Sequence, residues 1–159
     1  MTNKQNLIMA KLREIILQNI LEDGRKVFKF CGVIPDNSQC GNKFPAVFLK
    51  DGSEDYNSNG EVSSGMIDVE MNLQVFIHDN QARNASARMN ELQNLITTYF
   101  LQNLSLDGTA AFIWIDRAEK GNLIHRVYEE NDIDTAGYYA NHTVRELRFG
   151  IRFFDSRTV

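Results

Sequence analysis

The chain has 159 residues, of which 43% are hydrophobic and 24% charged, a size and composition that predict one globular domain over residues 1–159. Its 21 acidic and 17 basic residues give a formal net charge of −4, which argues against a protein that coats DNA or binds an anionic membrane. The same balance allows a ring through which DNA passes without specific binding. No apolar run approaches the roughly 18 residues of a transmembrane helix, so no membrane contact is expected.

The first predicted element is a helix over residues 5–22. Its apolar side chains recur at helical spacing and form one stripe, and Gly24 is predicted to end the helix. Charged residues interrupt the apolar run, so a signal peptide is not expected. The stripe consists of Ile8, Leu12, Ile15, Ile16 and Ile20.

Two short strands are predicted next, over residues 27–33 and 44–49. Pro45 has no N–H to donate, so it belongs at the start of its strand or on a sheet edge. Residues 51–64 are polar and rich in Gly, Ser and Asn, which predicts a hairpin-type loop or a flexible excursion.

The clearest pattern lies between Ile67 and Ile77, where the odd positions are all apolar and the even positions are polar except for Phe76. Strict alternation predicts a long strand with one buried face and one face in solvent. A one-sided antiparallel sheet gives this pattern, whereas a buried parallel strand does not.

A second helix is predicted over residues 85–103, followed by a strand over 111–115 that contains Trp114. Residues 117–140 are predicted to be irregular. The closing segment, residues 142–153, alternates again, and Arg145 on its apolar face predicts that the start of this strand leaves the core. The order of elements predicts an α+β fold with two layers, in which both helices pack on one face of a mostly antiparallel sheet.

The two long strands span 11–13 residues, which is roughly 36–43 Å at about 3.3 Å per residue. A compact chain of this length has a diameter of about 39 Å. The strands are therefore expected either to bend at a bulge or to project beyond the core, where an exposed edge invites pairing with another chain.

Charged residues on the solvent side of these strands are the candidates for an oligomer interface. One strand offers Asp68 and Glu70, and the other offers Arg148 and Arg152 as well as Glu146. Opposite charges could pair across neighbouring strands of one chain, or match acidic and basic surfaces between subunits, or simply be solvated.

No catalytic or metal-binding motif is recognisable. The nucleotide-binding and nucleophile signatures are absent, and none of His78, His125 and His142 has ligand spacing with another His, Cys or carboxylate pair. Cys31 and Cys40 lack the spacing of a zinc or redox motif and are expected to be free thiols. An acidic cluster lacks EF-hand spacing and is interpreted as a solvated loop; it contains Glu129, Glu130, Asp132 and Asp134. We therefore expect no enzyme activity, catalytic residue, metal or cofactor.

The order of elements from about residue 7 to residue 154 resembles the tail terminator family of long-tailed bacteriophages, also called minor tail or tail-completion proteins. The similarity is one of order and pattern and is weakest over residues 117–140. It includes the opening helix, the strand Phe44–Leu49, the strand Ile67–Asp79, the helix Met89–Leu104 with its exit Leu106-Asp107-Gly108, the Trp114 strand, and the closing strand through Phe154.

The resemblance implies a non-enzymatic virion protein without a cofactor, found in the tail and, during assembly, in the host cytoplasm. Such subunits form a ring, typically a hexamer, that caps the tail tube protein and offers a docking surface to the head–tail connector. Three alternatives remain open: another neck or tube component, a small enzyme or ligand-binding α+β domain, and a nucleic-acid-binding module.

Overall fold

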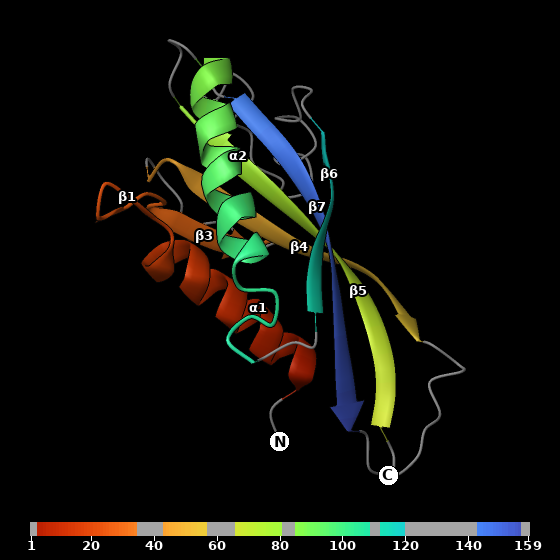
Figure 1. Cartoon of the computed structure of the whole chain (residues 1–159). Helices are drawn as coiled ribbons and strands as arrows, with labels where there is room; N and C mark the ends of the chain where they lie inside the picture. Colours follow the sequence, from red (N-terminus) through yellow and green to blue (C-terminus); the bar gives the residue numbers. More distant parts are fainter. Residues whose placement is uncertain are drawn as a thin grey trace.

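The computed structural model describes residues 3–34, 43–56, 66–80, 85–108, 112–119 and 143–156. Their elements form two helices, a short hairpin and a five-stranded sheet, which confirms the predicted α+β class (Figure 1). In chain order they are α1 (Lys4–Glu14), the π-helical turn η1 (Ile15–Asn19), β1 (Leu21–Glu22), β2 (Arg25–Lys26), β3 (Phe30–Val33), β4 (Ala46–Tyr56), β5 (Met66–Asp79), α2 (Ala85–Leu101), β6 (Phe112–Glu119) and β7 (Thr143–Ser156).

The large sheet has the strand order β3-β4-β5-β7-β6. Every pair in it is antiparallel except β3 with β4, which confirms the expectation of a mostly antiparallel sheet. Strands β5 and β7 have 14 residues each and pair along their whole length, from Met66 opposite Ser156 to Asp79 opposite Thr143. This ladder is the spine of the molecule.

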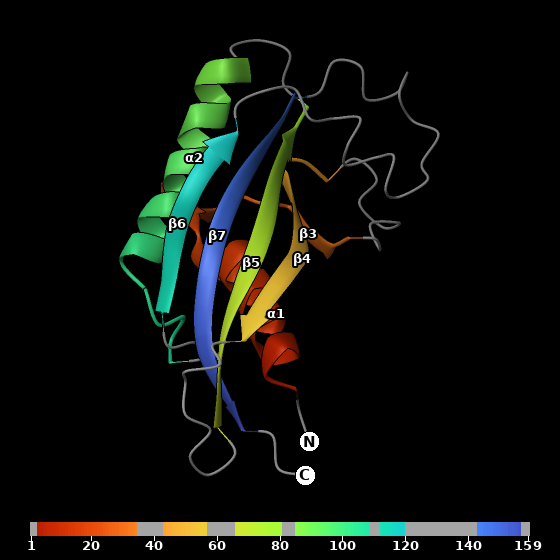
Figure 2. The same ribbon diagram turned by 90° about the vertical axis from the view of Figure 1, so that its right-hand side faces the viewer.

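Both helices lie on one face of the sheet, as predicted (Figures 1 and 2). The apolar odd-numbered residues of β5 and β7 point toward them and form the main core with the apolar faces of α1 and α2. The ring of Phe149 on β7, for example, meets the ring of Phe100 on α2 edge-on at 5.4 Å. We refer to the opposite face, which carries neither α1 nor α2, as the helix-free face.

The first helix is shorter than predicted, although its apolar stripe is buried as expected. The α-helix ends at Glu14 and widens into η1, where the N–H of Ile20 donates to the carbonyl of Ile15 at 3.0 Å. The chain then forms the β1–β2 hairpin, whose two-residue turn Asp23–Gly24 has positive φ angles of 52° and 76°. Gly24 therefore makes a hairpin turn, and its expected role as a helix stop is wrong.

Strand β4 continues through Tyr56, so the expectation of a loop is wrong for residues 51–56; residues 57–64 lie outside the described residues. A bulge between Asp51 and Glu54 interrupts the pairing with β5 and places Ser53 Oγ 2.8 Å from the Asn72 amide that donates to it. The segment is polar because most of its side chains are exposed. The polar composition of this segment had wrongly predicted a loop.

The remaining elements agree with the sequence to within a few residues. The strand predicted over 27–33 forms only over 30–33, and the helix predicted over 85–103 ends at Leu101. Strand β6 extends the predicted 111–115 segment to Glu119, so residues 117–119 are not irregular; residues 120–140 lie outside the described part of the chain. Pro45 directly precedes β4, as its missing N–H predicts.

Arg145 does not leave the core, contrary to the prediction. Its side chain is 5% exposed and donates to Asn90 Oδ1 at 2.6 Å and to Gln93 Oε1 at 2.9 Å, both on α2. The long side chain thus satisfies its guanidinium on the helix that covers it, and burial lowers the pKa of Arg145.

The helix-free face is buried at one end, where the expected solvent exposure of the even positions is wrong. Phe76 is 3% exposed and His78 is fully buried, with the ring centroid of His78 4.6 Å from that of Phe44. We call the apolar group at this end the proximal cluster; its buried members are Ile34, Ala46, Phe48, Phe76 and Val144.

The opposite end of the ladder extends past both helices. Figure 1 shows β5 and β7 curving away from the core until their ends, Met66 and Ser156, lie beyond α1 and α2. Of the two outcomes expected for such long strands, the structure shows the projection; the strands curve, but their mutual register is continuous, without a bulge. This projecting end is called the distal end below.

Candidate functional site

Three of the four predicted interface residues meet on the helix-free face at the distal end. Asp68 and Glu70 lie on β5, and Arg152 on β7 lies directly opposite Glu70. Arg148 lies on the same face, four residues nearer the proximal cluster and outside this group. The structure thus joins Asp68, Glu70 and Arg152 into one site and leaves Arg148 apart.

Asp68 and Arg152 form a two-pronged ion pair across the strands. Arg152 Nε donates to Asp68 Oδ1 at 2.9 Å, and Arg152 Nη2 donates to Asp68 Oδ2. The Asp68 carboxylate is largely buried, and its hydrogen bonds raise the pKa of Arg152. The guanidinium carbon of Arg152 also lies 5.4 Å from the centre of the Phe154 ring, within the range of a cation–π contact.

A row of four residues crosses the distal end of the helix-free face. The strand registers place Asp55 opposite Glu70, Glu70 opposite Arg152, and Arg152 opposite Phe112. The ring of Phe112 stacks with that of Trp114 at 6.0 Å. The sequence did not single out Asp55 or Phe112, because Asp55 lay in a supposed loop and Phe112 in a strand of unknown register.

We call this row, together with Asp68 and Phe154, the distal surface. It combines two features that are uncommon on a surface facing only water. The aromatic side chains of Phe112 and Phe154 are 43% and 45% exposed. The group has three carboxylates and one guanidinium, and two of the carboxylates, on Asp55 and Glu70, lie directly opposite each other, which is an unfavourable cross-strand pair. Its members are Asp55, Asp68, Glu70, Phe112, Arg152 and Phe154.

Arg148, the fourth predicted residue, is engaged within its own chain. Its Nε donates to Glu146 Oε2 at 2.6 Å, and the Gln74 amide donates to the same oxygen at 2.8 Å. The Glu146 carboxylate is fully buried, and its hydrogen bond raises the pKa of Arg148. A polar groove of about 300 Å³ lies alongside and is lined partly by Arg148, Asp116 and Asn72. Arg148 therefore completes the hydrogen bonding of a buried carboxylate in its own chain, and its role at an interface stays a prediction.

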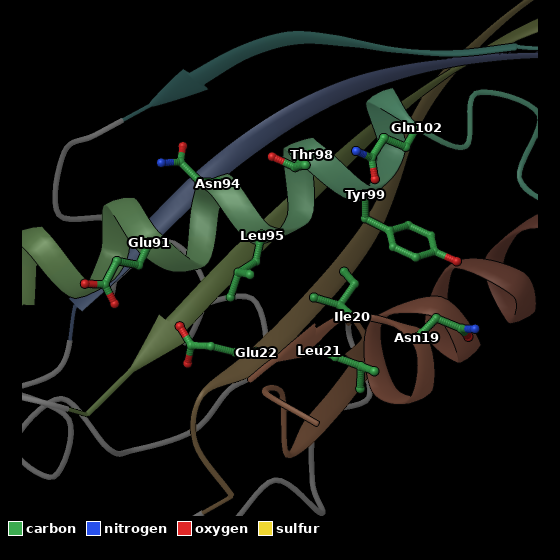
Figure 3. Close-up of a pocket in the computed structure, with 10 residues that line it drawn as sticks. All are labelled: Asn19, Ile20, Leu21, Glu22, Glu91, Asn94, Leu95, Thr98, Tyr99 and Gln102. Atoms are coloured by element: carbon green, nitrogen blue, oxygen red, sulfur yellow. The ribbon is translucent and has the colours of Figure 1, made fainter. Parts of the chain in front are cut away.

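The helix layer contains a separate cleft of about 490 Å³ between η1, β1 and α2 (Figure 3). Its described lining offers amides, a hydroxyl, a phenol, apolar groups and two carboxylates, without histidine or cysteine. One of the carboxylates, Glu22, is held by two hydrogen bonds from Arg88, which lower the pKa of Glu22. The lining residues are Asn19, Ile20, Leu21, Glu22, Glu91, Asn94, Leu95, Thr98, Tyr99 and Gln102.

The remaining chemistry within the described ranges is sparse. Among these residues, no group of three or more His, Cys, Asp or Glu side chains is placed to hold a metal ion. Cys31 is a buried free thiol, and burial raises its pKa to about 12; Cys40 is outside the described residues. None of the described helices is long and apolar enough to cross a membrane.

Comparison with known protein-family models gives no match, and no curated protein matches the chain.

Proposed function

We propose that this chain is a structural subunit of a phage tail, a tail terminator that assembles with copies of itself into a ring of six. The ring would cap the last layer of tail tube protein and present its other side to the head–tail connector. The proposal rests on the order of elements from about residue 7 to residue 154, which resembles that family, and on the distal surface.

The distal surface is the observation that carries the proposal. Exposed aromatic side chains and arginine are enriched in protein interfaces and supply much of their binding energy. Here Arg152 and Phe154 lie on β7, which extends past both helices (Figure 1), and Phe112 lies opposite Arg152 on β6. A neighbouring protein chain would bury Phe112 and Phe154 and add positive charge beside the opposed carboxylates of Asp55 and Glu70, which outnumber the guanidinium of Arg152.

The proposed mechanism is steric. A ring built from heterologous contacts closes on itself, with every subunit using one surface to bind the next. If one side of the ring complements the end of the tube and the other side does not repeat it, no further tube protein adds. DNA would pass through the opening without specific binding, in keeping with a net charge of −4. No catalytic residue or cofactor takes part.

Tube polymerisation tests this role directly. Purified tube protein should be polymerised with and without the chain, and tube lengths measured by electron microscopy. A terminator shortens the tubes in proportion to its concentration and is found at their ends. A neck or tube component would instead leave lengths unchanged or join the tube along its length, and either result would contradict the proposal.

The cleft between η1, β1 and α2 favours a second candidate, a small ligand-binding domain, because it is large enough for a small molecule. A thermal-shift screen would support this candidate if one compound raised Tm and replacement of Asn94 by leucine at the cleft wall abolished the shift.

A further inference from the structure

The β1–β2 hairpin carries the charge that the distal surface lacks. The side chains of Arg25 and Lys26 are exposed on β2, and Lys29 is exposed beside them, with its Nζ 3.5 Å from the carbonyl oxygen of Lys26. Asp23 in the turn is the opposing charge, because the Glu22 carboxylate is already held by Arg88. Three cations and one carboxylate leave the hairpin with an excess of two positive charges.

The distal surface has the reverse balance, with three carboxylates and one guanidinium. Its excess of two negative charges matches the hairpin in number. Opposite potentials on two surfaces favour their encounter and fix their register. The two surfaces also differ in shape, because a narrow hairpin faces a broad sheet.

One chain cannot bring these two surfaces together. Figure 1 places the β1–β2 hairpin on one side of the molecule and the distal ends of β4, β5 and β7 on the other. The hairpin is anchored by the Glu22–Arg88 contact to α2, and the distal surface belongs to the large sheet. A contact between them therefore requires a second copy of the chain.

We infer that the β1–β2 hairpin of one copy binds the distal surface of the next copy. Arg25 and Lys26 then lie against the opposed carboxylates of Asp55 and Glu70, and the hairpin covers the exposed part of the Phe154 ring that Arg152 leaves open. The contact is heterologous because the two surfaces are different, so each copy can still bind another at its opposite side. The inference deepens the proposed function by naming the contact that builds the ring.

Charge reversal tests the contact on the full-length protein. The hairpin variant is Arg25→Glu/Lys26→Glu, and the surface variant is Asp55→Lys/Glu70→Lys. Each should need at least a tenfold higher protein concentration to assemble. An equal mixture of the two should assemble again, because the charges are again opposite. The control is Asp116→Lys, an exposed reversal on β6 outside both surfaces, and it should assemble as the unmodified chain does. Assembly is measured by light scattering, and folding by circular dichroism.

Disulfide trapping tests the same contact when assembly is weak or when a reversed variant is unfolded. Arg25→Cys/Asp55→Cys, in a Cys40→Ser background that leaves only the buried native thiol of Cys31, should give a ladder of covalent oligomers under mild oxidation. Each single cysteine variant should give at most a dimer. The inference is overturned if the double variant gives no ladder, or if the charge-reversed variants assemble like the unmodified chain.

These results are distinguishable from failure of the proposed function. If a charge-reversed variant still caps tubes normally, the inferred contact is wrong but the proposed role in tail termination stands. A chain that gives the covalent ladder yet leaves tube lengths unchanged would keep the contact and lose the role in tail termination.

Discussion

The two ends of the β5–β7 ladder share the same alternation of residues that face the helices, but the opposite face has different surroundings at each end. At the proximal end both faces are buried, and Phe76, His78 and Val144 belong to a packed interior. At the distal end one face is open, and Phe154 is 45% exposed next to the paired charges of Asp68 and Arg152. The difference indicates that the proximal end stabilises the fold, whereas the distal end is available for binding.

Replacing two phenylalanines on β7, one buried and one exposed, should show the largest difference in the free energy of unfolding. Phe149 lies in the main core against Phe100, so Phe149→Ala should lower the free energy of unfolding by about 3–5 kcal/mol. Phe154→Ala, at an exposed position of the same strand, should change it by less than about 0.5 kcal/mol. Urea unfolding of both variants measures the difference, and equal losses would contradict the assignment of the distal end to binding.

Two arginines on β7 offer a similar comparison. Arg145 is buried beneath α2, so Arg145→Ala should cost about 1.5–3 kcal/mol through its lost bonds to Asn90 and Gln93. Arg152→Ala should reduce assembly much more than Arg145→Ala does, because its guanidinium is at the surface, and it should also cost stability through the two hydrogen bonds lost to the largely buried Asp68 carboxylate. Unfolding midpoints and native masses of both variants check this; an Arg152→Ala variant that assembles as the unmodified chain does would break the comparison.

Gly150 lies between the two ends, and the Trp114 ring occupies the space that a side chain would need. A Cβ at this position would fall 2.1 Å from the Trp114 ring, so Gly150→Ala should displace the ring and cost about 1–3 kcal/mol. The displacement should also change Trp114 fluorescence. Gly24→Ala is the control: it meets no atom but strains a positive φ, so it should cost stability without changing the fluorescence.

The smallest effect is expected at the base of the hairpin. Hydrogen bonds from Arg88 lower the pKa of Glu22 below its usual value, so this pair stabilises the fold above the unfolded pKa and loses that contribution as pH falls through the folded pKa. Both side chains are partly exposed and screened, so Glu22→Gln should cost only about 0.5 kcal/mol at pH 7. The stability difference between Glu22→Gln and the unmodified chain should close as pH falls through the folded pKa of Glu22; a difference that stays constant with pH would exclude the ion pair as its cause.

The comparison also explains what could be predicted from the sequence. The apolar stripe of α1 and the alternation of β5 and β7 identified the first helix, the two long strands and their buried faces, because periodicity reports burial on one face. It does not report whether the second face is covered, so His78 and Phe76 were wrongly expected to face solvent. Arg145 was misjudged because its hydrogen-bond acceptors, Asn90 and Gln93, lie more than fifty residues away in sequence.

The candidate site was only partly predictable for a related reason. Alternation placed Asp68, Glu70 and Arg152 on one face, yet it could not give the register that joins them to Asp55 and Phe112. The bulge in β4 and the polarity of residues 51–56 concealed a strand that only its pairing with β5 defines. Strand β1 of the basic hairpin lay inside the predicted helix, and its basic strand β2 lay between that helix and the next predicted strand.

The native mass of the purified chain, measured by light scattering over a concentration series with and without tube protein, tests the central claim most directly. Assembly into a closed ring predicts one discrete mass, near six times the 18.2 kDa of a single chain, that stops rising once it is reached. A mass that stays at 18.2 kDa at every concentration, both alone and with tube protein, would contradict the account.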